Sequence, residues 1–117
     1  MSRIIIVNHG TIADRQAFDG LLKEAVAGVE AGLPGTLGYE FYVDEEGARF
    51  LAHEAYADST AILAHLQHLT ESGIPQRMMG AVAFESAFVL GDVTAEVRQA
   101  LEPMGFQFLG LAEQARG

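Results

Sequence analysis

TLGYEFYVDEEGARFLAHEAY, residues 36–56, is the segment of the sequence that is most informative about the fold. Two aromatic and β-branched runs, 36–43 and 48–56, flank the turn Asp44-Glu45-Glu46-Gly47, and this pattern predicts a β-hairpin. With an even loop, alternate side chains of the two strands share a face. One face then carries Tyr39, Phe41, Val43, Phe50, Ala52, Glu54 and Tyr56, and the other carries Glu40, Tyr42, Arg49, Leu51, His53 and Ala55.

The segment before the hairpin predicts a strand and a helix. Ile4–Val7 is a continuous β-branched run, typical of a buried strand, and Asn8-His9-Gly10 predicts a turn after it. From Ala13 the apolar period changes to that of an amphipathic helix of about 18 residues, which ends at Gly32. Its apolar positions are Phe18, Leu21, Leu22, Ala25, Val26 and Val29.

The segment after the hairpin predicts a second helix, a strand and a short extension. Asp58 or Ser59 caps a helix that runs to about Thr70 and is closed by Gly73 and Pro75. Its apolar stripe is Ile62, Leu63, Leu66 and Leu69. A strand over 81–90, a short helix over 94–102 and a last short strand over 106–109 follow.

This order predicts an α+β fold, with the ferredoxin-like β-α-β-β-α-β arrangement and a short C-terminal α-β extension. We expect one domain over residues 1–117, with its core at about 3–91 and the extension at about 92–117. The helices cover one face of the antiparallel sheet, yet both faces of the hairpin carry large side chains. The sequence therefore predicts a homodimer that stacks sheet on sheet.

Composition narrows the class of protein. Seven Lys and Arg stand against 16 Asp and Glu, for a net charge of −9, so nucleic acid and anionic membrane surfaces are not expected partners. The chain has no cysteine, which excludes disulfides and thiolate chemistry. No apolar run approaches the ~18 residues of a membrane helix, and the one near the N-terminus is too short for a signal peptide. We therefore predict a cytoplasmic protein.

Several polar and aromatic side chains are candidates for a site. His65 falls at the boundary of the second helix's apolar stripe, where a histidine is available as a general acid or base near neutral pH, or as a structural hydrogen-bonding group. Asn8 offers both a donor and an acceptor, or serves only the turn. Glu54 accepts from a partner or orients a histidine. We expect the substrate pocket to be lined by Tyr39, Phe41, Tyr56 and His53.

Neither a metal nor another cofactor is predicted. His53-Glu54 opens like a metalloprotease motif, but the second histidine is missing and the stretch reads as a strand. His65 and His68 lie three residues apart on a helix with few carboxylates nearby, and His68 is expected to face solvent. Phosphate-binding and serine-hydrolase glycine motifs are absent from the sequence.

The central block resembles the antibiotic biosynthesis monooxygenase (ABM) domain family over about residues 36–69. The resemblance rests on Tyr39-Glu40-Phe41, Asp44, Gly47, Phe50, Glu54, Tyr56, Asp58-Ser59 and Ala64-His65-Leu66. It implies a dimeric α+β barrel. The family's helix histidine matches His65, and its third-strand glutamate and following aromatic match Glu54 and Tyr56. In the haem-degrading branch, Asn8 and His65 match two positions, but Tyr56 stands where a tryptophan is expected.

The resemblance implies a cofactor-independent monooxygenase that oxidises a quinol or aromatic phenol with O₂ in an apolar pocket. His65 would remove a phenolic proton, the anion would pass an electron to O₂, and Asn8 or a tyrosine would stabilise the oxyanion. Two alternatives stay open: a non-enzymatic small-molecule-binding dimer, and an isomerase of a small polar metabolite. Few cations lie near the candidate site, Arg49 being one, which disfavours the isomerase.

Overall fold

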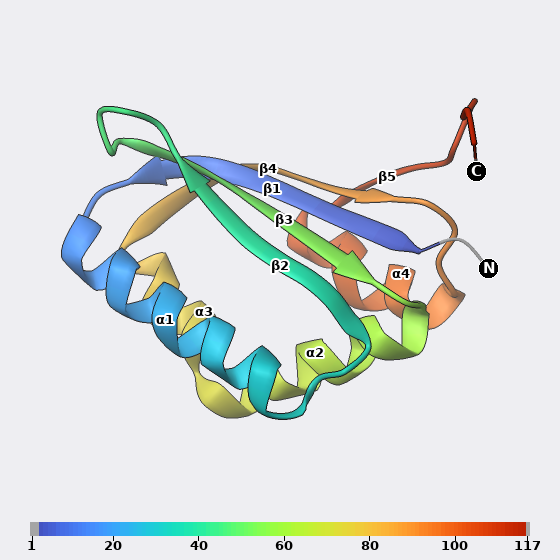
Figure 1. The fold of residues 1–117 in the computed structure, drawn as a ribbon, viewed down its shortest axis with the longest axis horizontal. Coiled ribbons are helices and arrows are strands. Elements are labelled where there is room, and N and C mark those ends of the chain that lie inside the picture. The colour runs from blue at the N-terminus through green and yellow to red at the C-terminus, as the bar shows by residue number, and fades with distance from the viewer. Residues whose placement is uncertain (1–2, 117) are drawn as a thin grey trace.

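The computed structural model describes residues 3–116 and has a five-stranded sheet with helices on one side (Figure 1). The strands are β1 (Ile4–Ile12), β2 (Thr36–Val43), β3 (Arg49–Tyr56), β4 (Val82–Leu90) and β5 (Gln107–Leu109). The helices are α1 (Arg15–Gly32), α2 (Ser59–Ser72), α3 (Ile74–Met79) and α4 (Ala95–Leu101), followed by the 3₁₀ turn η1 (Glu102–Met104).

The strand order in the sheet is β2-β3-β1-β4-β5. All neighbours run antiparallel except β4 and β5, which are parallel. The α+β, ferredoxin-like fold predicted from the sequence is therefore confirmed, with α4 and β5 as its C-terminal extension. Helices α1, α2 and α3 lie under one face, called here the inner face, and the opposite outer face is open (Figure 1).

The core between the sheet and the helices has two neighbouring clusters. The first joins α2 and α4 to the sheet and contains Ile4, Ile6, Tyr56, Ala61, Ile62, Val89, Val97 and Leu101. The second joins α1 and α3 to the sheet and contains Phe18, Leu21, Phe50, Met78, Ala81 and Val82. Side chains at helix N-termini fix where α1 and α2 begin, because Asp14 and Asp58 each accept a backbone N–H of the first turn.

The hairpin has the predicted parity. Tyr39 pairs with Glu54 and Phe41 with Ala52 on the inner face, whereas Glu40 pairs with His53 on the outer face. The continuation of the register across β1 and β4 gives the outer face an apolar centre. Its members are Ile5, Val7, Leu51, Ala55, Phe88 and Leu90.

Two predicted boundaries are wrong. Strand β1 does not end at Asn8 but continues to Ile12, because β3 and β4 flank it and its backbone groups pair on both sides. A register shift after His9 brings Gly10 so close to β4 that a Cβ there would lie 2.0 Å from a backbone oxygen. Pro75 does not close the second helix but opens α3, after Gly73 turns the chain with φ +71°.

Candidate acid–base site

A hydrogen-bonded cluster lies on the inner face of the sheet, beneath β1 and β3. The side-chain amide of Asn8 donates to Oε2 of Glu54 at 3.2 Å, and the Tyr56 hydroxyl donates to Oε1 of Glu54 at 2.5 Å. The same hydroxyl lies 2.6 Å from Nδ1 of His65 on α2. Strand alternation places Glu54 and Tyr56 on one face, and helix α2 brings the histidine to them. The structure thus joins four of the predicted site residues in one chain of contacts.

His65 lies deeper than the helical pattern predicts. Its side chain is 1 % exposed, and with Ala61 and Ile62 it forms the buried face of α2, so the predicted boundary position is wrong. A buried imidazole needs a polar partner, and the Tyr56 hydroxyl supplies one at Nδ1. No hydrogen-bond partner reaches its other ring nitrogen, Nε2, from residues 3–116.

Burial shifts the ionisation of the cluster in opposite directions. It raises the pKa of Glu54 to about 7, although the hydrogen bonds from Tyr56 and Asn8 lower it. Burial lowers the pKa of His65 to about 4, helped by the nearby His68. Burial, with the charge of Glu54, raises the pKa values of Tyr56 and Tyr39. At neutral pH, His65 is therefore a neutral imidazole, and Glu54 binds a proton far more readily than an ordinary carboxylate does.

An apolar groove lies on the other side of Tyr39 from the cluster, and none of the four cluster residues is among those that line it. It has a volume of about 420 Å³, lies between α1 and β2, and is lined by Leu22, Lys23, Val26, Ala27, Glu30, Tyr39 and Phe41. The Tyr39 ring meets the His65 ring edge-on, with their centroids 4.9 Å apart, and Phe41 packs on Tyr39 at 5.0 Å. Tyr39 therefore stands between the groove and the imidazole.

The α1 side of this groove was not identified from the sequence. Leu22 and Val26 lie four residues apart on α1, beside the buried Phe18, Leu21 and Ala25. This spacing is the feature of the sequence that could have identified the groove. Apolar residues at the side of a helix's buried stripe are partly buried, and a helix borders a groove at such positions.

The other three histidines make none of the hydrogen bonds of the cluster. His53, predicted to line the pocket, lies on the outer face with its Nδ1 3.8 Å from a Glu40 carboxylate oxygen. His9 also lies there, with its Nδ1 3.5 Å from Glu85. His68 does not face solvent as predicted but lies against α1, where a Cβ at Gly28 would come within 2.4 Å of its Nε2.

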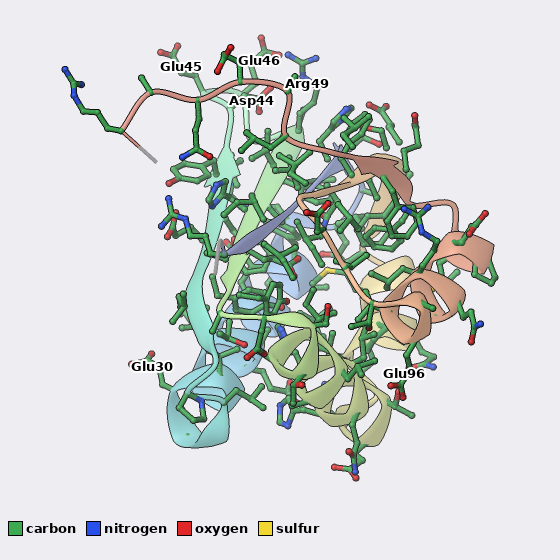
Figure 2. The ribbon with its side chains drawn as sticks, turned by 90° about the vertical axis from the view of Figure 1, so that its right-hand side faces the viewer. Glu30, Asp44, Glu45, Glu46, Arg49 and Glu96 are labelled. Atoms are coloured by element: carbon green, nitrogen blue, oxygen red, sulfur yellow. The ribbon has the colours of Figure 1, made fainter. Side chains whose placement is uncertain are left out.

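Several charged side chains lie at the edges of the molecule. Asp44, Glu45, Glu46 and Arg49 gather at the hairpin turn, far from Glu30 on α1 and Glu96 on α4 (Figure 2). A second hollow of about 360 Å³ lies beside this turn and includes His9 and Tyr42, but none of the acid–base cluster. Within residues 3–116, no three potential metal-ligating side chains gather, and no helix has the length and apolarity to cross a membrane.

Fold and site together define a ferredoxin-like α+β protein with a hydrogen-bonded acid–base cluster under its sheet. The chain belongs to the antibiotic biosynthesis monooxygenase family, whose model matches residues 1–70 and so includes every member of the cluster. No curated protein sequence matches the chain.

Solved structures share the fold. MupZ from Pseudomonas fluorescens is similar with a TM-score of 0.85 and 21 % identity, covering 100 % of this chain and 96 % of MupZ. SnoaB from Streptomyces nogalater, a cofactor-independent oxygenase, has a TM-score of 0.67 at 11 % identity, over 81 % of this chain and 97 % of SnoaB. Rv0793 from Mycobacterium tuberculosis has a TM-score of 0.66 at 16 % identity, over 80 % and 97 %.

Proposed function

We propose that this protein is a cofactor-independent monooxygenase that binds a quinol or aromatic phenol in the groove between α1 and β2. The observation that carries the proposal is a buried, neutral histidine beside an aromatic-lined groove, with its Nε2 free of partners in the described chain. Family membership and the fold shared with the oxygenase SnoaB support the reaction class.

The apolar walls of the groove suit a flat aromatic ring. Leu22, Val26 and Phe41 offer apolar contacts, and a ring that enters beside Tyr39 brings its hydroxyl toward His65. Because Tyr39 covers the imidazole, its side chain must turn aside for direct proton transfer. Burial then excludes water from the reacting phenolate.

The proposed reaction uses electrons from the substrate. His65 accepts the phenolic proton, and the phenolate passes one electron to O₂ to give a substrate radical and superoxide. The two recombine to a peroxide anion at a ring carbon that bears hydrogen, and His65 returns its proton to the peroxide. Loss of water leaves one oxygen atom on that carbon as a carbonyl, so a phenol and O₂ give a quinone and water. The substrate supplies all four electrons, and this scheme assigns no role to a flavin or a metal.

The outer face supports a homodimer, with a second copy of this chain as its occupant. On the outer face, Leu51 is 38 % exposed at the apolar centre, and Tyr42 on the edge strand β2 is 56 % exposed beside it. Stacking two such faces would remove this surface from water. A cytoplasmic location stays a prediction from the sequence.

Oxygen uptake tests the activity. The assay uses an oxygen electrode and a panel of naphthohydroquinones and polyphenols, with wild type, His65→Ala and the matched control His68→Ala, which changes another histidine of the same helix. We expect uptake above autoxidation for wild type and His68→Ala, and a loss of about 100-fold or more for folded His65→Ala, the range that acid–base groups contribute. No enzyme-dependent uptake by the folded wild type, or equal uptake by His65→Ala, contradicts the proposal.

A non-enzymatic binder is the second candidate, because Tyr39 covers His65 and leaves the apolar groove as the accessible surface. Saturable binding of an aromatic ligand without oxygen uptake would favour it. An isomerase of a polar metabolite is less well supported, since Lys23 is the single cation among the residues that line the groove.

A further inference from the structure

Three side chains form a hydrogen-bonded chain that runs from the sheet to the ring of His65. Glu54 and Tyr56 come from β3, and His65 comes from α2. The Tyr56 oxygen lies 2.5 Å from Oε1 of Glu54 and 2.6 Å from Nδ1 of His65, and both distances are short for hydrogen bonds of their kind. Asn8 holds the second carboxylate oxygen from the neighbouring strand.

The single hydroxyl proton of Tyr56 allows two arrangements of this chain. When Tyr56 donates to ionised Glu54, its oxygen accepts from Nδ1–H of His65, and Nε2 carries a lone pair. When Glu54 is protonated, it donates to the Tyr56 oxygen, Tyr56 donates to Nδ1, and the imidazole proton is on Nε2. Because the Asn8 amide donates to Oε2, the carboxyl proton of the second arrangement belongs on Oε1, which faces Tyr56.

We infer that Tyr56 and Glu54 are positioning residues that act through His65: a proton taken up at Nε2 is passed by way of Tyr56 to Glu54, so that His65 changes tautomer rather than charge. The bonds balance. An Nε2–H bond forms as Nδ1–H breaks, the Tyr56 oxygen gains that proton as it loses its own, and an Oε1–H bond forms on Glu54. One negative charge leaves Glu54, and one appears on the molecule that gave up the proton.

The surroundings favour this transfer over a charged imidazole. An imidazolium at a side chain that is 1 % exposed loses hydration, and burial lowers the pKa of His65 to about 4. Burial raises the pKa of Glu54 to about 7, so the proton is more stable on the carboxylate. The titratable groups that face the chain from packed elements are Tyr39 on β2 and His68 on α2, with Lys23 and Glu30 of α1 along the groove beyond Tyr39.

The ¹⁵N resonances of the His65 ring test the inference on the substrate-free, full-length protein between pH 5 and 9. We expect His65 to stay neutral, with its proton on Nε2 at low pH and on Nδ1 at high pH, and a midpoint near 7. Glu54→Gln should abolish the switch and hold the Nε2–H tautomer, because the amide then donates to Tyr56. Tyr56→Phe should also abolish it.

Tyr42→Phe is the matched control. It removes the hydroxyl that donates to Glu40 at 3.0 Å, the same kind of pair two residues apart, on the outer face of the hairpin. It should leave the switch unchanged. An imidazolium forming near the ordinary pKa of 6.5, a tautomer independent of pH in wild type, or a switch that persists in Glu54→Gln would overturn the inference.

The proton transfer from His65 through Tyr56 to Glu54 rests on the proposed function only for its use in catalysis. Either proposal can therefore be wrong while the other holds. The resonances are recorded without substrate or O₂, so missing oxygen uptake leaves the tautomer switch standing. If uptake is found, Glu54→Gln should lower kcat more than KM and remove the limb of the pH profile near 7. Should Tyr56→Phe fail to fold, Glu54→Gln, which preserves the shape of the side chain, decides the matter.

Discussion

Replacing Glu54 by glutamine should change how the stability of the protein depends on pH. The pKa of Glu54 rises from an ordinary 4.5 to about 7 on folding, so the folded state binds the carboxyl proton more tightly than the unfolded state. Its contribution to stability is therefore present at low pH and is lost as the pH rises through 7. At 1.36 kcal/mol for each pH unit of difference, the loss between pH 5 and 8 is about 2–3 kcal/mol.

The contribution of His65 to the pH dependence of stability has the opposite sign and masks part of the Glu54 contribution. Its pKa falls from 6.5 to about 4, so its contribution is lost as the pH drops from 6.5 toward 4. Between pH 4.5 and 6.5 the two slopes nearly cancel in wild type. Glu54→Gln removes one of them, and its stability relative to wild type should therefore increase by about 2–3 kcal/mol from pH 5 to pH 8.

The assay is urea denaturation followed by circular dichroism at pH 5, 6, 7 and 8, on both proteins at one protein concentration and ionic strength. The difference between the two free energies of unfolding cancels the titration of groups that the proteins share. A difference for Glu54→Gln that does not change with pH would contradict the prediction, because Glu54 would then titrate alike in the folded and unfolded states.

Three further changes test the packing and the outer face. Gly10→Ala should lower the free energy of unfolding by about 1–3 kcal/mol or more, because a Cβ there meets the backbone of β4. Gly20→Ala, on the open surface of α1, should raise it by about 0.5–1 kcal/mol. Urea denaturation measures both changes. Phe18→Ala should cost about 3–5 kcal/mol in the same assay, since the ring is 0 % exposed. Leu51→Glu should convert the proposed dimer to monomer in light scattering, while Met79→Glu on α3 should not.

Period-two patterning was enough to assign the hairpin and its faces. Alternation from Tyr39 to Tyr56 predicts that Glu54 and Tyr56 lie on the same side, and the register confirms that placement. The extent of β1 was not predictable in the same way. Asn8, His9 and Gly10 are typical of a turn, and their strand conformation comes from two neighbouring strands that only the fold brings together.

The depth of His65 was also beyond the sequence pattern. A helical wheel built from apolar residues centres the buried face of α2 on leucines and places a histidine at its boundary. The structure buries the histidine because the Tyr56 hydroxyl satisfies Nδ1, and that partner belongs to another element of the fold. Wheel positions carry no information about such a partner.

The two Glu–Tyr pairs of the hairpin show why register decides the chemistry. Glu40–Tyr42 and Glu54–Tyr56 have the same spacing and the same hydroxyl–carboxylate hydrogen bond. One pair is exposed on the outer face, and the other is covered by α2, where burial shifts its ionisation and a histidine completes it. Because side chains alternate, a slip of one residue would turn Tyr56 and Glu54 away from His65.

The hairpin turn therefore matters to the site although it lies at the far end of the strands. Asp44 accepts the backbone N–H groups of both Ala48 and Arg49, at 2.9 and 3.1 Å, and Gly47 adopts φ +73°, which favours glycine. These contacts fix the number of residues in the loop and with it the pairing of β2 with β3. Asp44 never touches the acid–base cluster, yet the turn that it stabilises sets the register that places Tyr39 opposite Glu54 and against the His65 ring.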